Sequence, residues 1–189
     1  MAARHKIAVF ASGDGSNFEA IAEACLRGEI DAEVALMVCD KPSARVCSRA
    51  ERLGISSFVF TPADYASKAD YEREIAARCE QAGIELICLA GYMRMVGKTL
   101  LDAFAGRIVN LHPSLLPAFK GARAIKQALE YGVKVFGATI HYVDESLDGG
   151  RIIAQRAVDY HGGDLAEITA AIHVVEHALY IETIKKLLT

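Results

Sequence analysis

The stretch IAVFASGDGSNFEAIAEACLRG, residues 7–28, decides the fold. It begins with a short apolar run, 7–11, passes through a loop with two glycines, and continues with apolar residues at helical spacing. Gly28 then stands where a helix commonly ends. A buried strand, a tight loop and a helix in this order predict the first unit of an α/β domain, in which helices cover a parallel sheet.

Similar apolar runs recur along the chain, and helical patterns separate the earlier ones. The predicted strands are 7–11, 34–39, 58–60, 84–90, 108–111, 135–141 and 152–158. Because strand and helix alternate, we expect a single-domain, Rossmann-like α/β fold with a mostly parallel sheet of about seven strands and helices on both faces. The last two strands follow each other across the turn 144–150 and predict a C-terminal antiparallel extension. A long helix at about 164–188 ends the chain.

Length and composition favour one domain with a large core. Of the 189 residues, 52% are hydrophobic. The net charge is −3, so the protein lacks the positive electrostatic field that is typical of nucleic-acid binders. The five cysteines have no C-x-x-C spacing and are interpreted as reduced thiols. No apolar run approaches the roughly 18 residues of a membrane span, and residues 1–6 lead into a strand rather than a signal peptide. We therefore expect a cytoplasmic monomer or homodimer with no nucleic-acid or membrane partner.

The loop of the opening unit has the features of an anion site. Gly13 and Gly15 permit a tight turn and a close backbone approach, while free N–H groups at the start of a helix attract negative charge. Ser16 and Asn17 add side-chain donors. The loop lacks the third glycine of a dinucleotide fingerprint and the lysine of a P-loop. It predicts a phosphate site, with a plain capped turn as the alternative.

Two polar residues lie near the end of the fifth predicted strand, in the sequence IVNLHPSLLP, residues 108–117. Asn110 and His112 are two positions apart, so they lie on the same side of a strand. An imidazole can transfer protons near neutral pH, and a neighbouring amide can donate to a developing oxyanion. Asp148, in the turn of the last hairpin, offers a carboxylate that would fix the tautomer of the imidazole. The alternatives are a histidine that only ends a strand and an ordinary turn aspartate.

The final helix contains HVVEH, residues 173–177, which matches the pattern of inverted zinc proteases. His173 and His177 would share one helical face. A catalytic zinc site needs a third protein ligand, and only Glu182 follows as a carboxylate, on the same helix. We therefore expect no metal and interpret these residues as a polar stripe near a ligand.

Together these segments resemble those of the phosphoribosylglycinamide formyltransferases, folate-dependent enzymes that formylate glycinamide ribonucleotide in purine synthesis. The resemblance covers almost the whole chain, in the family's order and spacing, through segments 12–17, 89–94, 110–117, 148–150 and 176–177. It implies a formyltransferase fold over residues 1–189, with a nucleotide-binding half, 1–105, and a catalytic and folate-binding half, 106–189. It also implies that 10-formyltetrahydrofolate is the co-substrate.

The resemblance further implies roles for individual residues. Asn110, His112 and Asp148 match the catalytic triad, which would stabilise the oxyanion formed when the glycinamide amine attacks the formyl carbon. The residues implied to bind the nucleotide are Gly15, Ser16, Asn17, Lys68 and Glu176. Those implied to bind the folate are Met93, Arg94, Met95, Val96, Val143, Asp144, Glu145 and Leu147. The chain departs from the family near Ile125, where many relatives have histidine, and at His173, where they have Lys or Gln.

Three other functions compete with this one. Methionyl-tRNA formyltransferase and formyltetrahydrofolate hydrolase share the Asn-His-Asp triad, but the first has an additional C-terminal domain and the second an N-terminal regulatory domain. The phosphate loop also weighs against the tRNA enzyme. A nucleotide-binding module without catalysis would use Asp40, at the end of the second strand, to bind a ribose hydroxyl. That interpretation leaves Asn110, His112 and Asp148 without a role.

Overall fold

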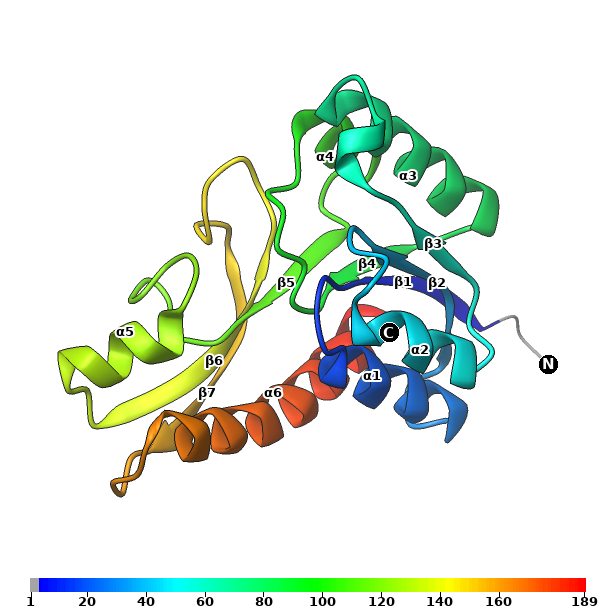
Figure 1. Ribbon diagram of the computed structural model, residues 1–189. Helices are drawn as coiled ribbons and strands as arrows, with labels where there is room; N and C mark the ends of the chain where they lie inside the picture. Colours follow the sequence, from blue (N-terminus) through cyan, green and yellow to red (C-terminus); the bar gives the residue numbers. More distant parts are fainter. Residues whose placement is uncertain (1–3) are drawn as a thin grey trace.

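The computed structural model describes residues 4–189 and contains one seven-stranded sheet (Figure 1). Its strands are β1 (His5–Phe10), β2 (Ala32–Cys39), β3 (Ser57–Val59), β4 (Leu86–Leu89), β5 (Ile108–His112), β6 (Val135–Tyr142) and β7 (Ile152–Asp159). Every predicted strand is present, and no end differs by more than two residues from its predicted place. Residues 1–3, part of the stretch in which no signal peptide is expected, lie outside the described residues.

The strands lie in the order β3-β2-β1-β4-β5-β6-β7. Every pair of neighbouring strands among β1 to β5 is parallel, whereas β6 pairs antiparallel with both β5 and β7. The prediction of a mostly parallel sheet with a C-terminal antiparallel extension is therefore confirmed. Because β1 lies between β2 and β4, the loops after β1 and β4 leave the sheet at a switch in strand order. Ligands of α/β proteins bind at such a switch.

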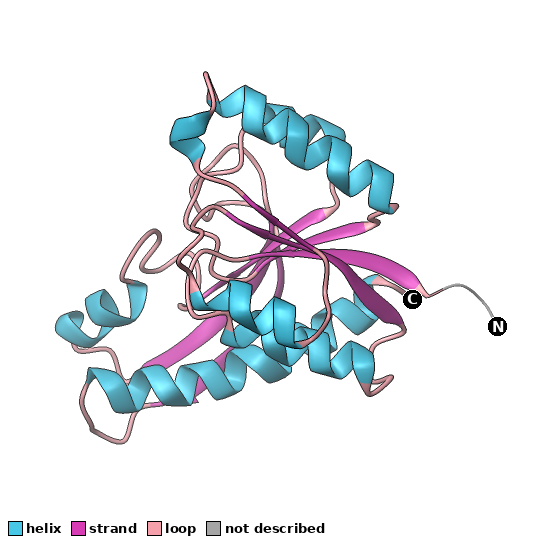
Figure 2. Ribbon diagram, turned by 45° about the vertical axis from the view of Figure 1, so that its right-hand side comes forward, coloured by secondary structure: helices cyan, strands magenta, loops and turns pink. Residues whose placement is uncertain are grey.

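Helices cover both faces of the sheet (Figure 2). On one face pack α1 (Ser16–Leu26), α2 (Arg45–Arg52) and the long α6 (Leu165–Leu187), and on the other pack α3 (Lys68–Ala82) and α4 (Lys98–Ala103). Helix α5 (Ala124–Tyr131) packs with the first half of α6 against Phe136 of β6, and a 3-10 turn, Pro62–Asp64, precedes α3. Within residues 4–189, no helix combines the length and apolarity that a membrane span requires.

Strand β1 shows why the sheet has two helical layers. Ile7 and Val9 belong to the core cluster that includes α1 and α6, whereas Ala8 and Phe10 belong to the cluster that includes α3. All four side chains are fully buried. A continuous apolar run is the pattern of a strand that is covered on both faces, and this pattern is the one that the opening stretch displays.

Helix α6 is fixed at both ends. At its start, Asp164 and Glu167 form a reciprocal capping box, with hydrogen bonds of 2.9 and 3.0 Å between each side chain and the other's amide. Towards its end, the buried Tyr180 hydroxyl is 3.0 Å from the carbonyl oxygen of Leu89 and 3.3 Å from that of Val109. These contacts hold the helix against β4 and β5. They also position Glu176, which lies one turn before Tyr180 on the same side of the helix.

Candidate active site

The loop after β1 is built around Gly15. This residue has φ +81° and precedes the first turn of α1. A Cβ at this position would lie 2.6 Å from Cγ2 of Val46, so the close packing of α2 against the loop requires glycine. Gly15 has no side chain with which to cap α1, and the first N–H groups of a helix have no partner within it. The backbone N–H groups of Ser16 and Asn17 therefore suit an anion such as phosphate.

Glu176 of α6 reaches this loop across 159 positions of sequence. The Asn17 side-chain amide donates a 3.0 Å hydrogen bond to Oε2 of Glu176. Burial raises the pKa of the Glu176 carboxyl, and the Asn17 hydrogen bond opposes the rise. The second amide atom, Oδ1 of Asn17, is buried and has no hydrogen-bond partner within the part of the chain that the structure describes. An unpaired buried acceptor costs free energy, so this oxygen suits a donor group on a ligand.

Lys68, also predicted to bind the nucleotide, lies at the start of α3. Its ammonium nitrogen is 3.8 Å from Oε1 of Glu72, and its side chain lies against Gly97. Glu72 is buried and accepts a 2.6 Å hydrogen bond from the Gly97 amide. Lys68 is thus placed next to the end of the segment 93–96, which is predicted to bind folate. Its contact with the nucleotide stays a prediction.

Asn110, His112 and Asp148 come together at the carboxyl end of β5. Asn110 and His112 lie on β5, and Asp148 lies in the loop between β6 and β7. Nδ1 of His112 is 3.3 Å from Oδ2 of Asp148, and Nδ2 of Asn110 is 3.5 Å from Oδ1 of Asp148. The structure therefore brings the three predicted catalytic side chains within reach of one another.

Asp148 is kept ionised by its surroundings. Its pKa is lowered to about 2, first by the neighbouring His141 side chain and then by the hydrogen bond from the Gly121 amide and the charge of His112, while burial opposes the change. The Gly121 amide donates a 2.7 Å hydrogen bond to Oδ2 of Asp148. The backbone of Asp148 has φ +44°, a left-handed conformation that Asp and Asn adopt more readily than other L residues. Both the backbone and the contacts of this position thus suit a short carboxylate.

His141 belongs to this cluster, although the sequence analysis does not predict it. It lies on β6 directly opposite Asn110 in the antiparallel register. Its Nε2 is 3.1 Å from Nδ2 of Asn110 and 3.7 Å from Oδ1 of Asp148, and its Nδ1 is 2.8 Å from the carbonyl oxygen of Tyr142. Because that carbonyl can only accept, Nδ1 carries a proton. The one signal in the sequence is a histidine at the end of an apolar run.

Both ring nitrogens of His112 face acceptors. Nδ1 faces Asp148, and Nε2 is 2.8 Å from the carbonyl oxygen of Phe119. A ring that donated from both nitrogens at once would be doubly protonated and cationic. The His112 ring is buried, so Asp148 rather than water would balance such a charge. Phe119 itself has φ +52°, so the carbonyl that covers His112 belongs to a backbone segment of uncommon conformation.

The residues predicted to bind folate form two loops, after β4 and after β6. In the first loop Met93 and Met95 are exposed and Val96 is buried, and in the second Leu147 is exposed. Val96 belongs to the core cluster on the α3 side of the sheet, and Val143 packs against the same cluster, so both loops begin on that side. Exposed Met and Leu side chains next to convergent polar groups are typical of a site for a flat aromatic ligand.

The polar residues of these two loops have different environments. Arg94 is partly exposed, and its Nε donates a 2.8 Å hydrogen bond to Oδ2 of Asp40. Asp144 accepts hydrogen bonds from the Ser146 hydroxyl and amide, which lower the pKa of its carboxyl. Glu145 is exposed. Asp144 thus shapes the turn through Ser146, while Arg94 and Glu145 remain accessible to a ligand.

Of residues 4–189, no three His, Cys, Asp or Glu side chains come together as a metal-binding group. The rings of His173 and His177 stack with centroids 6.5 Å apart, and Nε2 of His173 is 3.9 Å from Oε2 of Glu176.

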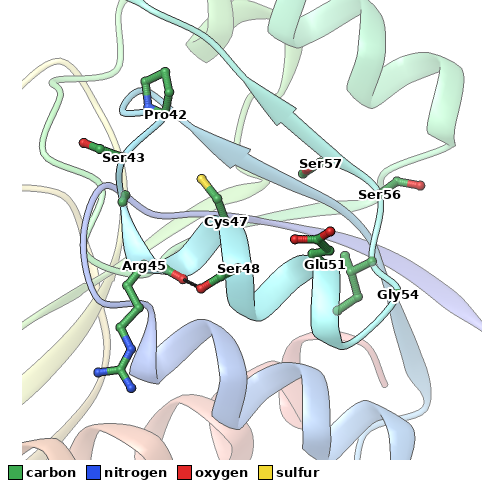
Figure 3. A pocket seen from close by; sticks show the side chains of 11 residues that line it. Pro42, Ser43, Arg45, Cys47, Ser48, Glu51, Gly54, Ser56 and Ser57 are labelled. Atoms are coloured by element: carbon green, nitrogen blue, oxygen red, sulfur yellow. Dashed lines mark hydrogen bonds between the residues drawn. The ribbon is translucent and has the colours of Figure 1, made fainter.

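A hollow of about 780 Å³ lies beside α2 and is lined by Pro42, Cys47, Glu51 and Ser57 among others (Figure 3). None of the predicted site residues lines it.

Comparison with known proteins identifies relatives along almost the whole chain. The sequence model of the formyl transferase family matches residues 5–184. Phosphoribosylglycinamide formyltransferase of Bacillus subtilis (strain 168) is 53% identical over 184 residues, which are 97% of this chain and 94% of that protein. Glycinamide ribonucleotide transformylase 1 from Geobacillus kaustophilus has a crystal structure similar to this one, with a TM-score of 0.95 and 51% identity over 98% of this chain and 100% of that chain. Phosphoribosylglycinamide formyltransferase from Bacillus halodurans gives a TM-score of 0.94 and 49% identity over 97% and 95% of the two chains. The chain therefore belongs to the formyl transferase family.

Proposed function

We propose that the chain transfers the formyl group of 10-formyltetrahydrofolate to the amine of 5-phosphoribosylglycinamide, giving formylated nucleotide and tetrahydrofolate in purine biosynthesis. The observation that carries this proposal is the cluster of Asn110, His112, His141 and Asp148, at the same end of the parallel strands as the loop after β1 that suits an anion. The similarity to phosphoribosylglycinamide formyltransferases over nearly the full length supports the same pair of substrates.

The nucleotide would bind between the loop after β1 and α6. The N–H groups of Ser16 and Asn17 would hold the phosphate, because a helix start attracts an anion without needing a basic side chain. The unpaired Oδ1 of Asn17 and the carboxylate of Glu176 would accept hydrogen bonds from the donors of the glycinamide or ribose portion. Position 173 is a histidine only 3.9 Å from Glu176 and adds a further polar contact.

The folate would bind across the loops 93–96 and 143–147. Met93, Met95 and Leu147 would cover its aromatic portions, and the Arg94 guanidinium would pair with a carboxylate of its glutamate end. Lys68, beside Gly97 at the end of the first of these loops, would contact the nucleotide. The two substrates would then meet at Asn110, His112 and Asp148.

The reaction forms one carbon–nitrogen bond and breaks another. The lone pair of the glycinamide nitrogen attacks the formyl carbon, and the formyl oxygen becomes an oxyanion. The bond between the formyl carbon and N10 of the folate then breaks. The attacking nitrogen loses one proton and N10 gains one, so the protons balance. Holding both substrates in one site contributes up to about 7–11 kcal/mol, because the two reactants no longer have to find each other.

His112 would stabilise the oxyanion as a donor, and Asp148 would hold His112 cationic. Asn110 would also donate, with the N–H that makes the long 3.5 Å contact with Asp148 turning to the oxyanion. His141 would accept from the Asn110 amide through Nε2 and so fix the orientation of that amide. For Nε2 of His112 to face the oxyanion, the Phe119 carbonyl has to turn away from it. The positive φ of Phe119 is a conformation that a non-glycine residue leaves readily, which favours that movement.

The partners that we propose are these two small molecules, for a cytoplasmic protein acting as a monomer or homodimer. The net charge of −3 supports the absence of a nucleic-acid partner.

A label-transfer experiment tests the proposal. The enzyme is incubated with 5-phosphoribosylglycinamide and a folate whose formyl carbon is ¹³C, and mass spectrometry follows the nucleotide. We expect labelled formyl nucleotide, formed roughly 10²–10⁴-fold more slowly by His112→Ala. Asp102→Asn, which removes an exposed partner of Lys98 on α4, is the matched control and should leave the rate unchanged. Labelled formate without labelled nucleotide would instead indicate a hydrolase.

A further inference from the structure

Asp40 is a buried carboxylate that the proposed reaction does not use. It directly follows β2, and its side chain is 1% exposed. One carboxylate oxygen accepts a 2.5 Å hydrogen bond from the Ser12 hydroxyl, and the other accepts a 2.8 Å hydrogen bond from Nε of Arg94. Both oxygens are therefore committed within the protein, and the sequence-based alternative of a ribose contact would require Asp40 to give up one of these bonds.

Ser12 extends the contact to a second residue of the folate segment. Its hydroxyl oxygen accepts a 2.9 Å hydrogen bond from the Met93 amide, and its own amide donates a 3.0 Å hydrogen bond to the Gly91 carbonyl. Ser12 also begins the loop that leads to the predicted phosphate site. Asp40 thus connects, through two side chains, the loop after β1 with the loop after β4.

The geometry at Arg94 leaves one edge of the guanidinium for a ligand. Asp40 occupies Nε. The Arg94 side chain is nevertheless 39% exposed. An arginine whose Nε is fixed presents its remaining donors as a rigid fork, which matches the planar geometry of a carboxylate. A freely rotating arginine would lose more conformational entropy on binding the same group.

We propose that Asp40 is a positioning residue for the folate: it orients the Arg94 guanidinium toward a carboxylate of the folate's glutamate end and, through Ser12, fixes the Met93 amide. The inference rests on the proposed function, since it names the ligand of Arg94 as that folate. Asp40 contacts neither the substrate nor the reacting atoms. Its loss should therefore change folate binding more than the chemical step.

The test compares Asp40→Ala, Asp40→Asn, Arg94→Ala and the double variant Asp40→Ala/Arg94→Ala. Asp40→Ala leaves the Ser12 hydroxyl and Nε of Arg94 without their buried acceptor, and we expect the folate KM to rise ~10-fold with kcat within about 3-fold. The change in nucleotide KM should be smaller. Asp40→Asn keeps an acceptor oxygen and should restore most of the folate KM.

The double variant separates positioning from a purely structural role. If Asp40 acts mainly through Arg94, the double variant should have nearly the folate KM of Arg94→Ala alone, because the effects of coupled residues do not add. Melting temperatures show that each variant is folded, and Asp102→Asn again serves as the control. A folded Asp40→Ala enzyme with unchanged folate KM, or strictly additive effects in the double variant, would overturn the proposal.

A separate binding measurement distinguishes failure of this inference from failure of the proposed function. Tetrahydrofolate is titrated into the wild-type protein and into Asp40→Ala, and binding is followed by calorimetry. Binding by the wild type that weakens ~10-fold in Asp40→Ala supports the inference. Equal binding by both proteins overturns the inference alone, whereas no binding by the wild type overturns the function on which it rests.

Discussion

Replacing Asp148 with asparagine removes the negative charge of the cluster with little other change. Asparagine has nearly the same shape and tolerates the left-handed φ of +44° at this position, whereas alanine would add backbone strain. Its Oδ1 can still accept from the Gly121 amide, which donates to Oδ2 of Asp148 at 2.7 Å. The substitution therefore tests whether the charge of residue 148, rather than its place in the turn, supports catalysis.

The size of the effect follows from the environment of Asp148. Its pKa falls from 3.8 to about 2, which corresponds to about 2.5 kcal/mol in favour of the ionised carboxylate. The side chain is 12% exposed, so water screens these contacts only weakly. His112 is only one cause of this shift, after His141 and the Gly121 amide. Hydrogen bonds to charged groups contribute about 1.5–3 kcal/mol, so losing the ionised partner of a cationic His112 in the transition state should lower kcat by roughly 10- to 150-fold. Both KM values should change much less, because Asp148 is not proposed to hold either substrate in the ground state.

The assay is the absorbance change on release of the folate product, measured at saturating concentrations of both substrates and neutral pH. Asp159→Asn is the matched control, since Asp159 lies opposite Val135, at the other end of β6 from His141. We expect wild-type kcat for the control. A folded Asp148→Asn enzyme with kcat within about 3-fold of the wild type would refute the reasoning, because the charge would then contribute less than about 0.7 kcal/mol.

Three further predictions concern the same end of the parallel strands. Gly15→Ala should lower the melting temperature and weaken nucleotide binding, because the new Cβ would lie 2.6 Å from Cγ2 of Val46; a normal melting curve would contradict this. Asn17→Ala should raise the nucleotide KM about 10-fold, through loss of the contact with Glu176 and of the ligand-facing Oδ1, while the folate KM stays constant; the reverse pattern in steady-state kinetics would place the nucleotide elsewhere. Asp148 has a lowered pKa when folded, so its stabilisation of about 2.5 kcal/mol is present above pH ~4 and is lost as the pH falls toward 2; in urea titrations, the stability gap between wild type and Asp148→Asn should therefore close over that range.

The architecture was accessible from the sequence because its signals are local. Each buried strand is a short apolar run, and a run such as 7–11 is apolar at every position because helices cover both faces of the sheet. The ends of α6 follow local rules as well, since Asp164 and Glu167 form the capping box that starts it. The order of the strands is not local. The periodicity of the sequence does not predict it, and the structure supplies it.

The site was partly accessible for the same reason. Asn110 and His112 were paired by the two-residue period of one strand, which requires no tertiary information. His141 was missed because its place opposite Asn110 depends on the antiparallel register of β5 and β6. The contact between Asn17 and Glu176 and that between Asp40 and Arg94 likewise join distant segments, whose meeting depends on strand order and helix packing. Lys68 shows the same limit, because its neighbour Gly97 lies at the end of the folate segment.

The central claim is that formyl transfer requires both substrates at one site. The most direct measurement follows absorbance of the folate product from 10-formyltetrahydrofolate with and without 5-phosphoribosylglycinamide. The account predicts release of tetrahydrofolate only when the nucleotide is present, in a one-to-one ratio with formylated nucleotide. Release at the same rate without the nucleotide would contradict it and indicate a hydrolase, and no release from a protein that binds both substrates would show that the cluster around His112 is not catalytic.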